Sequence, residues 1–233
     1  MSSEHIYKQF DADMEGVRAR VLEMGGLVEE QVGRAVEALI SGNVTLAEEV
    51  IVNDHKVNAM EVASDEACTH IIALRQPTAG DLRMILTIVK TITDLERIGD
   101  EASKIARYAI KIFESDRIAS PRYNDIKYMA GLATRMLRES LDAFARLDAS
   151  GAAGVARQDR EVDEEFQMIM RNLITYMMED PRTITTFIDL LFVVKAIERI
   201  GDHAKNMSEY VVFMVKGKDV RHTTIEEMER ELQ

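Results

Sequence analysis

Two short acidic motifs are the residues of this chain best suited to chemistry. The sequence ERIGD occurs at 96–100 and again at 198–202, so the two copies are 102 residues apart. Within each copy the glutamate and the aspartate are four residues apart, and in a helix both carboxylates therefore lie on one face. Apolar residues surround each copy, and charged groups in such surroundings need partners. A repeated pair of carboxylates on one helix face predicts a cation-binding site.

A second polar pair is expected to lie opposite each ERIGD motif. If the chain turns back at residues 77–78 and at Pro181, residues equally far from each turn face each other in an antiparallel helix pair. This register sets Asp54 level with Asp100 in the first copy. The predicted first cluster is Asp54, Asn58, Glu96 and Asp100, and the predicted second cluster is Asp159, Asp163, Glu198 and Asp202.

The composition of these clusters favours a hard metal ion. Carboxylates at one level repel each other when ionised, and a multivalent cation removes that repulsion. Oxygen ligands suit magnesium, calcium, manganese or iron better than a tight structural zinc. Asn58 makes the first cluster one charge poorer, so the second cluster is expected to bind a cation more tightly.

Interpretations without a metal remain open. An acidic pair on a helix is commonly a solvated face whose charges pair with neighbouring side chains. In that case Gly99 and Gly201 would permit close helix contact, which explains a glycine that costs about 1 kcal/mol relative to alanine in a helix. Glu96 and Glu198 would then pair with nearby arginines. His203, beside the second motif, is expected at the surface.

Helical periodicity runs through most of the chain and defines the elements that position these residues. Apolar residues recur at spacings of three and four, and Pro77, Pro121 and Pro181 mark helix boundaries. Residues 24–39 align with 129–144, an offset of 105 residues. The expected helices cover roughly 8–41, 43–75, 79–115, 121–149, 153–179 and 182–215. The second three therefore repeat the first three.

The repeat predicts an all-α protein made of two tandem antiparallel three-helix bundles. The expected divisions are a first repeat at 1–116, a second repeat at 117–216 and a polar tail at 217–233.

Composition narrows the class of protein further. The net charge of −12 argues against binding to nucleic acid or anionic lipid. Neither a signal peptide nor a membrane-spanning run of about 20 apolar residues is expected. Cys68, the single cysteine, excludes an internal disulfide and fits the reducing cytoplasm; its apolar register predicts a buried thiol.

The chain resembles the PhoU family over nearly all of residues 1–215. The resemblance rests on both ERIGD copies and on DHKVNAMEVASDEAC (54–68), IIALRQPTAGDLRMIL (71–86) and ITYMMEDPRTI (174–184). It implies two three-helix bundles side by side, a cytoplasmic location and a homodimer. It also implies metal clusters, mostly of iron or zinc, on the bundle surfaces at the ExxxD and DxxxD pairs, a pattern from which Asn58 departs.

The same resemblance implies a regulatory role. PhoU-like proteins are negative regulators of the phosphate-starvation response and of phosphate uptake, and they link the ATPase subunit of the phosphate ABC transporter to a membrane sensor histidine kinase. A different class, a carboxylate-bridged di-iron enzyme, needs Glu-x-x-His motifs inside a bundle. None of the five histidines follows a glutamate at that spacing, so a protein that is not an enzyme is favoured. A metal-free helical scaffold is the remaining alternative.

Overall fold

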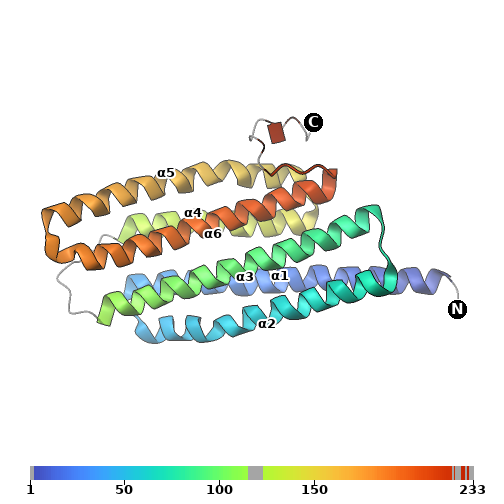
Figure 1. The fold of residues 1–233 in the computed structure, drawn as a ribbon, viewed down its shortest axis with the longest axis horizontal. Helices are drawn as coiled ribbons and strands as arrows, with labels where there is room; N and C mark the ends of the chain where they lie inside the picture. The colour runs from blue at the N-terminus through green and yellow to red at the C-terminus, as the bar shows by residue number, and fades with distance from the viewer. Residues whose placement is uncertain (1–2, 115–122, 222, 224–226, 229, 231–233) are drawn as a thin grey trace.

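Six long helices and one short 3₁₀ turn make up the computed structural model, which describes residues 3–114, 123–221, 223, 227–228 and 230 (Figure 1). Across these residues no strand is present, as the periodicity predicted. The helices are α1 (Ser3–Ser41), α2 (Val44–Arg75), α3 (Ala79–Glu114), α4 (Tyr123–Arg146), α5 (Ala149–Glu179) and α6 (Ile184–Lys216), with η1 (Pro181–Thr183) before α6. Pro121, expected at a boundary, lies outside the described residues.

The helix ends follow from local side-chain chemistry. The Asn43 side chain accepts a hydrogen bond from the backbone N–H of Leu46 and so caps α2. Asp148 caps α5 in the same way. Gly217 ends α6 with a φ of 73°, in the left-handed region where glycine has no Cβ penalty.

The helices form two antiparallel bundles that lie side by side. Helices α1 to α3 make one bundle and α4 to α6 make the other, and each bundle packs a buried apolar core (Figure 1). Across the boundary α3 packs along α6 and α1 packs on α4, so each of these helices meets its equivalent in the other repeat. The expected pair of three-helix bundles is therefore confirmed.

Polar and charged pairs connect the two bundles where α3 meets α6. Nδ1 of His203 donates to Oδ1 of Asp94 at 2.6 Å, and both residues are buried. The guanidinium of Arg199 pairs with Glu101 at 2.9 Å. The prediction that His203 lies at the surface is wrong, because α3 covers it and leaves it only 8% exposed.

A second group of contacts supports the same boundary nearer the end of α3. The rings of Tyr108 and Phe192 stack with their centroids 5.2 Å apart. Lys111 pairs with the buried Asp189 at 2.6 Å. The boundary therefore combines ion pairs with aromatic packing along much of both helices.

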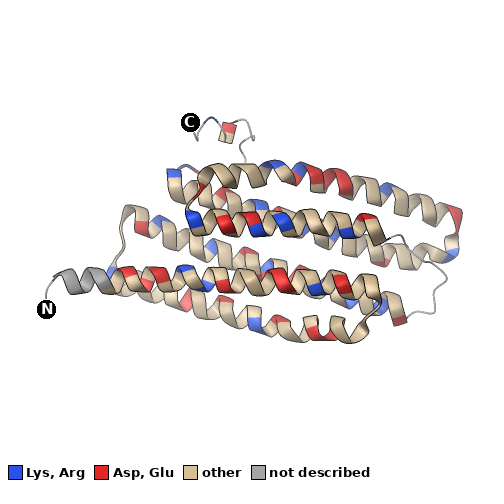
Figure 2. Cartoon of the chain, turned by 180° about the vertical axis from the view of Figure 1, so that it is seen from behind, with Lys and Arg blue, Asp and Glu red and all other residues tan. Residues whose placement is uncertain are grey.

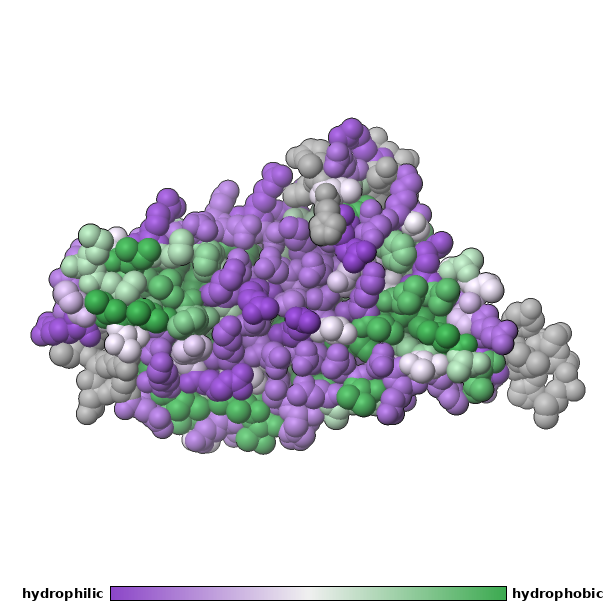
Figure 3. Space-filling view, viewed as in Figure 1, coloured by the Kyte–Doolittle hydropathy of each residue, from purple (hydrophilic) through white to green (hydrophobic). Residues whose placement is uncertain are grey.

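The surface carries charges of both signs, with acidic groups in excess. Acidic and basic residues are interspersed along the helices (Figure 2). Viewed as in Figure 1, apolar side chains gather toward both ends of the molecule and a polar band lies between them (Figure 3). Among the described residues no helix has an apolar stretch long enough to cross a membrane.

Candidate metal centres

Close approach of α2 to α3 builds the first cluster. A Cβ added at Gly99 would lie 3.3 Å from Cγ1 of Val57 and 3.5 Å from Oδ1 of Asp54. The glycine thus lets α2 approach α3 at the level of the ERIGD motif, and Asp54 reaches over its backbone. Asn58, one helical turn further along α2, is exposed.

The acids of the first cluster repel one another, and this repulsion helps to raise the pKa of Asp54 and of Glu96. Partial burial and the neighbouring Asp100 carboxylate raise the pKa of Asp54. Partial burial, Asp100 and the additional acid Glu61 raise the pKa of Glu96. These residues are therefore close enough to disfavour one another's charge, which the helix register predicted for Asp54 and Asp100.

A buried oxygen in the first cluster lacks a hydrogen-bond partner. Oδ1 of Asp54 is shielded from solvent and accepts no hydrogen bond that meets normal geometry within the described part of the chain. The hydroxyl of Ser103, on a fully buried residue of α3, is likewise without such a bond, since its hydrogen bond to Asp54, which lowers the pKa of that acid, falls short of normal geometry. Buried polar atoms normally have partners, so these two oxygens mark a place that a cation or water can satisfy.

The second cluster repeats this arrangement between α5 and α6. A Cβ at Gly201 would lie 3.3 Å from Cγ1 of Val162. Desolvation, with the Glu198 and Asp159 carboxylates, raises the pKa of Asp202 to about 6. Desolvation, Asp159 and Glu198 also raise the pKa of Asp163, which is exposed on α5. The four predicted residues of the second cluster therefore interact as one acidic group.

Two lysines belong to the second cluster and were missed by the sequence reasoning. Nζ of Lys205 lies 2.6 Å from Oδ2 of Asp159, and Nζ of Lys195 lies 2.6 Å from Oε2 of Glu198. The spacing of Lys195 to Glu198 is a signal that was available, since residues three apart are neighbours on a helix. The other pair has no such local signal, because Asp159 and Lys205 are 46 positions apart on different helices.

The chemistry of the donors fits an oxygen-preferring cation, but the described side chains do not form a closed coordination sphere. Nowhere in the described ranges do three or more His, Cys, Asp or Glu side chains stand in an arrangement that could hold a metal ion. Binding would therefore require carboxylates to turn toward a common point. Asp54 and Ser103 provide buried oxygens that such a movement would satisfy.

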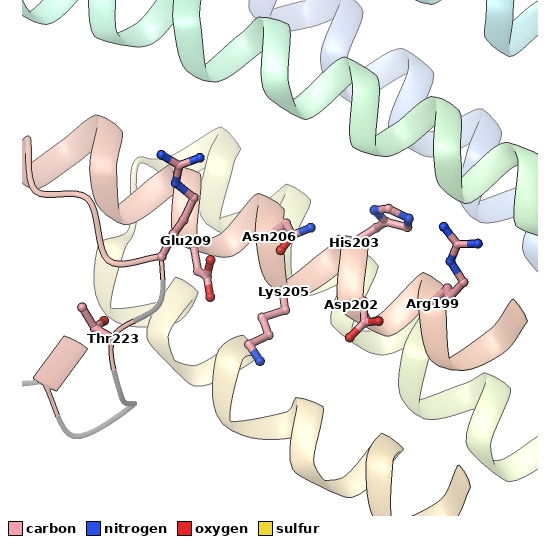
Figure 4. Close-up of a pocket in the computed structure, with 8 residues that line it drawn as sticks. Arg199, Asp202, His203, Lys205, Asn206, Glu209 and Thr223 are labelled. Carbon is pink, nitrogen blue, oxygen red and sulfur yellow. The ribbon is translucent and has the colours of Figure 1, made fainter. Parts of the chain in front are cut away.

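A polar cleft of about 500 Å³ runs along α6 beside the second cluster. Figure 4 shows Arg199 and His203 pointing toward α3, whereas Asp202 and Lys205 point the opposite way, toward α5. Arg221 also lines the cleft and pairs with Asp219 at 2.5 Å. The cationic groups of the cleft are thus held in ion pairs.

Comparison with known proteins places both halves of the chain in one group. A sequence model described as PhoU domain matches residues 21–109 and 126–211, one match within each bundle. The PhoU homolog of Pseudomonas aeruginosa, a phosphate-specific transport system accessory protein, is 47% identical over 99% of this chain and 95% of its own length. The accessory protein PhoU of Escherichia coli is 45% identical over 98% of this chain and 94% of its own length.

Solved structures are similar in fold as well. The crystal structure of PhoU from Pseudomonas aeruginosa has a TM-score of 0.86 and 48% identity, covering 90% of this chain and 100% of that one. The phosphate transport system regulatory protein PhoU from Streptococcus pneumoniae has a TM-score of 0.84 and 29% identity, covering 91% of this chain and 99% of that one.

Proposed function

This chain belongs to the PhoU family, and from that membership we propose that it acts as a regulatory accessory protein of a phosphate transport system. The observation that carries the proposal is the extent of the similarity, which spans both bundles and 98% to 99% of the chain. The proposed role is negative regulation of the phosphate-starvation response and of phosphate uptake. The protein would act in the cytoplasm as a homodimeric adaptor between the transporter ATPase subunit and a sensor histidine kinase.

The described side chains favour an adaptor over an enzyme. The Cys68 thiol is fully buried, and desolvation raises its pKa to about 11, so it is a poor nucleophile. His203 is engaged with Asp94 inside the α3–α6 boundary. A di-iron enzyme would place its carboxylates inside a bundle core. The two acidic clusters instead lie where a pair of helices meets solvent, since Asp100 and Asp202 are exposed.

We further propose that this chain binds a metal ion (magnesium, manganese, iron or zinc) through the oxygen ligands of a carboxylate cluster. The support is the mutual repulsion of the acids and the unpartnered oxygen of Asp54. A bound cation would neutralise the acids of its cluster and hold that helix pair together at its glycine contact. Carboxylates that repel in the free protein stabilise the fold when a cation joins them.

The regulatory proposal is tested by deleting the gene in its host and measuring a phosphate-starvation reporter in phosphate-rich medium. The expected result is an active reporter in the deletion strain and restored repression with the wild-type gene. Normal repression in the deletion strain would contradict the proposal. A parallel affinity purification from phosphate-replete cells should recover the transporter ATPase and the sensor kinase.

Metal content separates the remaining alternatives. Elemental analysis of protein purified without chelators should find a metal if the clusters bind one, whereas a metal-free scaffold contains none. An oxygen-consumption assay on iron-loaded protein tests the di-iron enzyme, and we expect no turnover. Light scattering on the same sample tests the proposed homodimer.

A further inference from the structure

The two carboxylate clusters differ at two positions that carry a lysine in one repeat and a hydroxyl in the other. With the 102-residue offset between the ERIGD copies, Lys195 of α6 corresponds to Thr93 of α3. Lys205 of α6 likewise corresponds to Ser103 of α3. The second repeat therefore carries two ammonium groups where the first carries two hydroxyls.

The two lysines act on all four acids of the second cluster. Lys205 contacts Asp159 and Lys195 contacts Glu198, each at 2.6 Å. Both lysines lower the pKa of Asp163, against the larger effect of its acidic neighbours. Two positive charges thus stand within a group of four carboxylates.

Packing holds these ammonium groups in place. The Asp159 side chain is 8% exposed and the Glu198 side chain 12% exposed, whereas Lys205 and Lys195 are 35% and 48% exposed, so the carboxylate side of each contact is shielded from water and the lysine side meets solvent. Nζ of Lys195 also lies 5.3 Å from the ring centroid of Phe166, a cation–π contact from α5. Each ammonium therefore has at least one partner that a freely moving surface lysine lacks.

The first cluster has no comparable internal charge. The Thr93 hydroxyl donates to the Val89 carbonyl of its own helix at 3.1 Å, so this hydrogen bond is not made to the acids of the cluster. No Lys or Arg forms an ion pair with Asp54, Glu96 or Asp100 in the described parts of the chain. Arg97 and Arg107 act on this cluster only over longer distances, and both are exposed.

The buried Ser103 hydroxyl points to a ligand at the first cluster. Ser103 is fully buried, and its hydrogen bond to Asp54, which lowers the pKa of that acid, falls short of normal geometry, so its Oγ has no well-formed partner among the described residues. At the equivalent place in the second cluster, the ammonium of Lys205 contacts Asp159. Lys205 thus supplies in direct contact a positive charge that, in the first repeat, Arg107 provides only from beyond ion-pair distance.

We propose that Lys195 and Lys205 are built-in counter-ions that close the second cluster to metal ions, so that the first cluster is the cation site of this chain. The proposal rests on the proposed cation binding and names the residues that direct it. A divalent cation entering the second cluster must displace two ammonium groups from their carboxylates. One entering the first cluster displaces none. This order is the reverse of the one obtained by counting ligand charges alone.

The test is calorimetric titration of chelator-treated protein with manganese chloride. We expect one class of sites in the wild-type protein, and we expect Glu96→Gln with Asp100→Asn to abolish it. Lys195→Thr with Lys205→Ser, which installs the first-repeat residues, should add a second class of sites at the second cluster. Relieving two nearby positive charges should lower the dissociation constant there by about tenfold or more. Adding Glu198→Gln with Asp202→Asn to this lysine variant should remove the gained sites.

Two controls make the outcomes distinct. Lys127→Ser removes a positive charge from α4, in a groove lined by Gly33 and Arg138, and should not add a site. Circular dichroism melts of each variant, including the two single lysine variants, establish that the fold is retained. Binding to the wild-type protein at both clusters, with no change in the lysine variant, would overturn the counter-ion proposal and leave cation binding standing. Absence of binding to every variant would overturn both.

Discussion

His203 of α6 donates a hydrogen bond to Asp94 of α3 across the boundary between the two bundles, with 2.6 Å between Nδ1 and Oδ1. Both residues are more than nine-tenths buried, so neither can exchange its partner for bulk water. The pair therefore contributes to the orientation of one bundle on the other as well as to stability.

Removing either member of this pair should destabilise the protein. Asp94→Ala and His203→Ala should each lower the free energy of unfolding by about 1–3 kcal/mol, because each breaks a buried hydrogen bond. In a double-mutant cycle the two losses should be less than additive. Urea unfolding of the four proteins measures the coupling. The exposed pair Arg135 and Glu161, 3.6 Å apart, is the control and should couple by less than about 1 kcal/mol. Equal coupling in the two cycles would contradict the prediction.

The glycines of the two ERIGD motifs should respond to alanine differently from other helical glycines. Gly33 of α1 has no atom within 4 Å of an added Cβ, so Gly33→Ala should stabilise the protein by about 0.5–1 kcal/mol. At Gly99 and Gly201 the added Cβ would lie 3.3 Å from a buried valine, and the helices must move apart slightly. Gly99→Ala and Gly201→Ala should therefore gain less than the control or lose stability. Thermal melts of the three alanine variants test this prediction. Equal gains in stability for all three would show that Gly99 and Gly201 do not pack tightly against the facing valines.

Glu209 should make stability depend on pH. Desolvation is the main cause of a pKa that rises from 4.5 to about 7, with Asp159 adding to the shift and Lys205 opposing it. A carboxyl with a raised pKa binds its proton more tightly in the folded state, so it destabilises the fold as pH rises from about 4.5 to about 7. Glu209→Gln removes this effect and should gain stability relative to wild type at pH 8 but little at pH 4.5. Urea unfolding of both proteins at pH 4.5 and pH 8 measures this gain. An equal difference in unfolding free energy at the two pH values would contradict the role of Glu209.

Cys68 should resist modification until the protein unfolds. The residue is fully buried in α2, and desolvation raises the pKa of its thiol to about 11. The reactive thiolate is therefore scarce at neutral pH as well as inaccessible. Iodoacetamide followed by mass spectrometry should find almost no labelling in buffer and complete labelling in concentrated urea. Rapid labelling of the folded protein would contradict the burial of this helix face.

Most of the fold could be predicted because periodicity and proline positions act locally. The expected segment 79–115 begins where α3 (Ala79–Glu114) begins, and its last residue lies outside the described residues. The start of α5 was placed too late, at 153, because the glycines near 151–154 were interpreted as a break. Asp148 caps the backbone N–H groups of Ser150 and Gly151, and the helix begins at Ala149 instead.

The candidate sites could be predicted only in part. The register of two helices joined by a short turn follows from the sequence, whereas the partner that a long or interfacial side chain contacts does not. Counting residues from the expected turn at 77–78 predicts that Asp54 lies near Asp100, because both belong to helices of the same bundle. The contact of Lys205 with Asp159 depends on the direction in which a flexible side chain turns. The burial of His203 depends on α3, more than 80 residues earlier in the chain, and no pattern within α6 reveals it.

The contact of α3 with its equivalent, α6, determines which repeats can pair with each other. Such contacts between equivalent helices approximate a two-fold axis, and a true dimer of one repeat would place identical residues on both sides. Here the partners have diverged: Glu101 occupies the position equivalent to His203 in the other repeat. Two first repeats would bring Asp94 toward a second Glu101, although Arg97, the equivalent of Arg199, could still face Glu101. Two second repeats would bring Arg199 toward a second His203, and His203 would face Ala196 in place of Asp94. The buried histidine–aspartate pair can therefore form only between one first repeat and one second repeat.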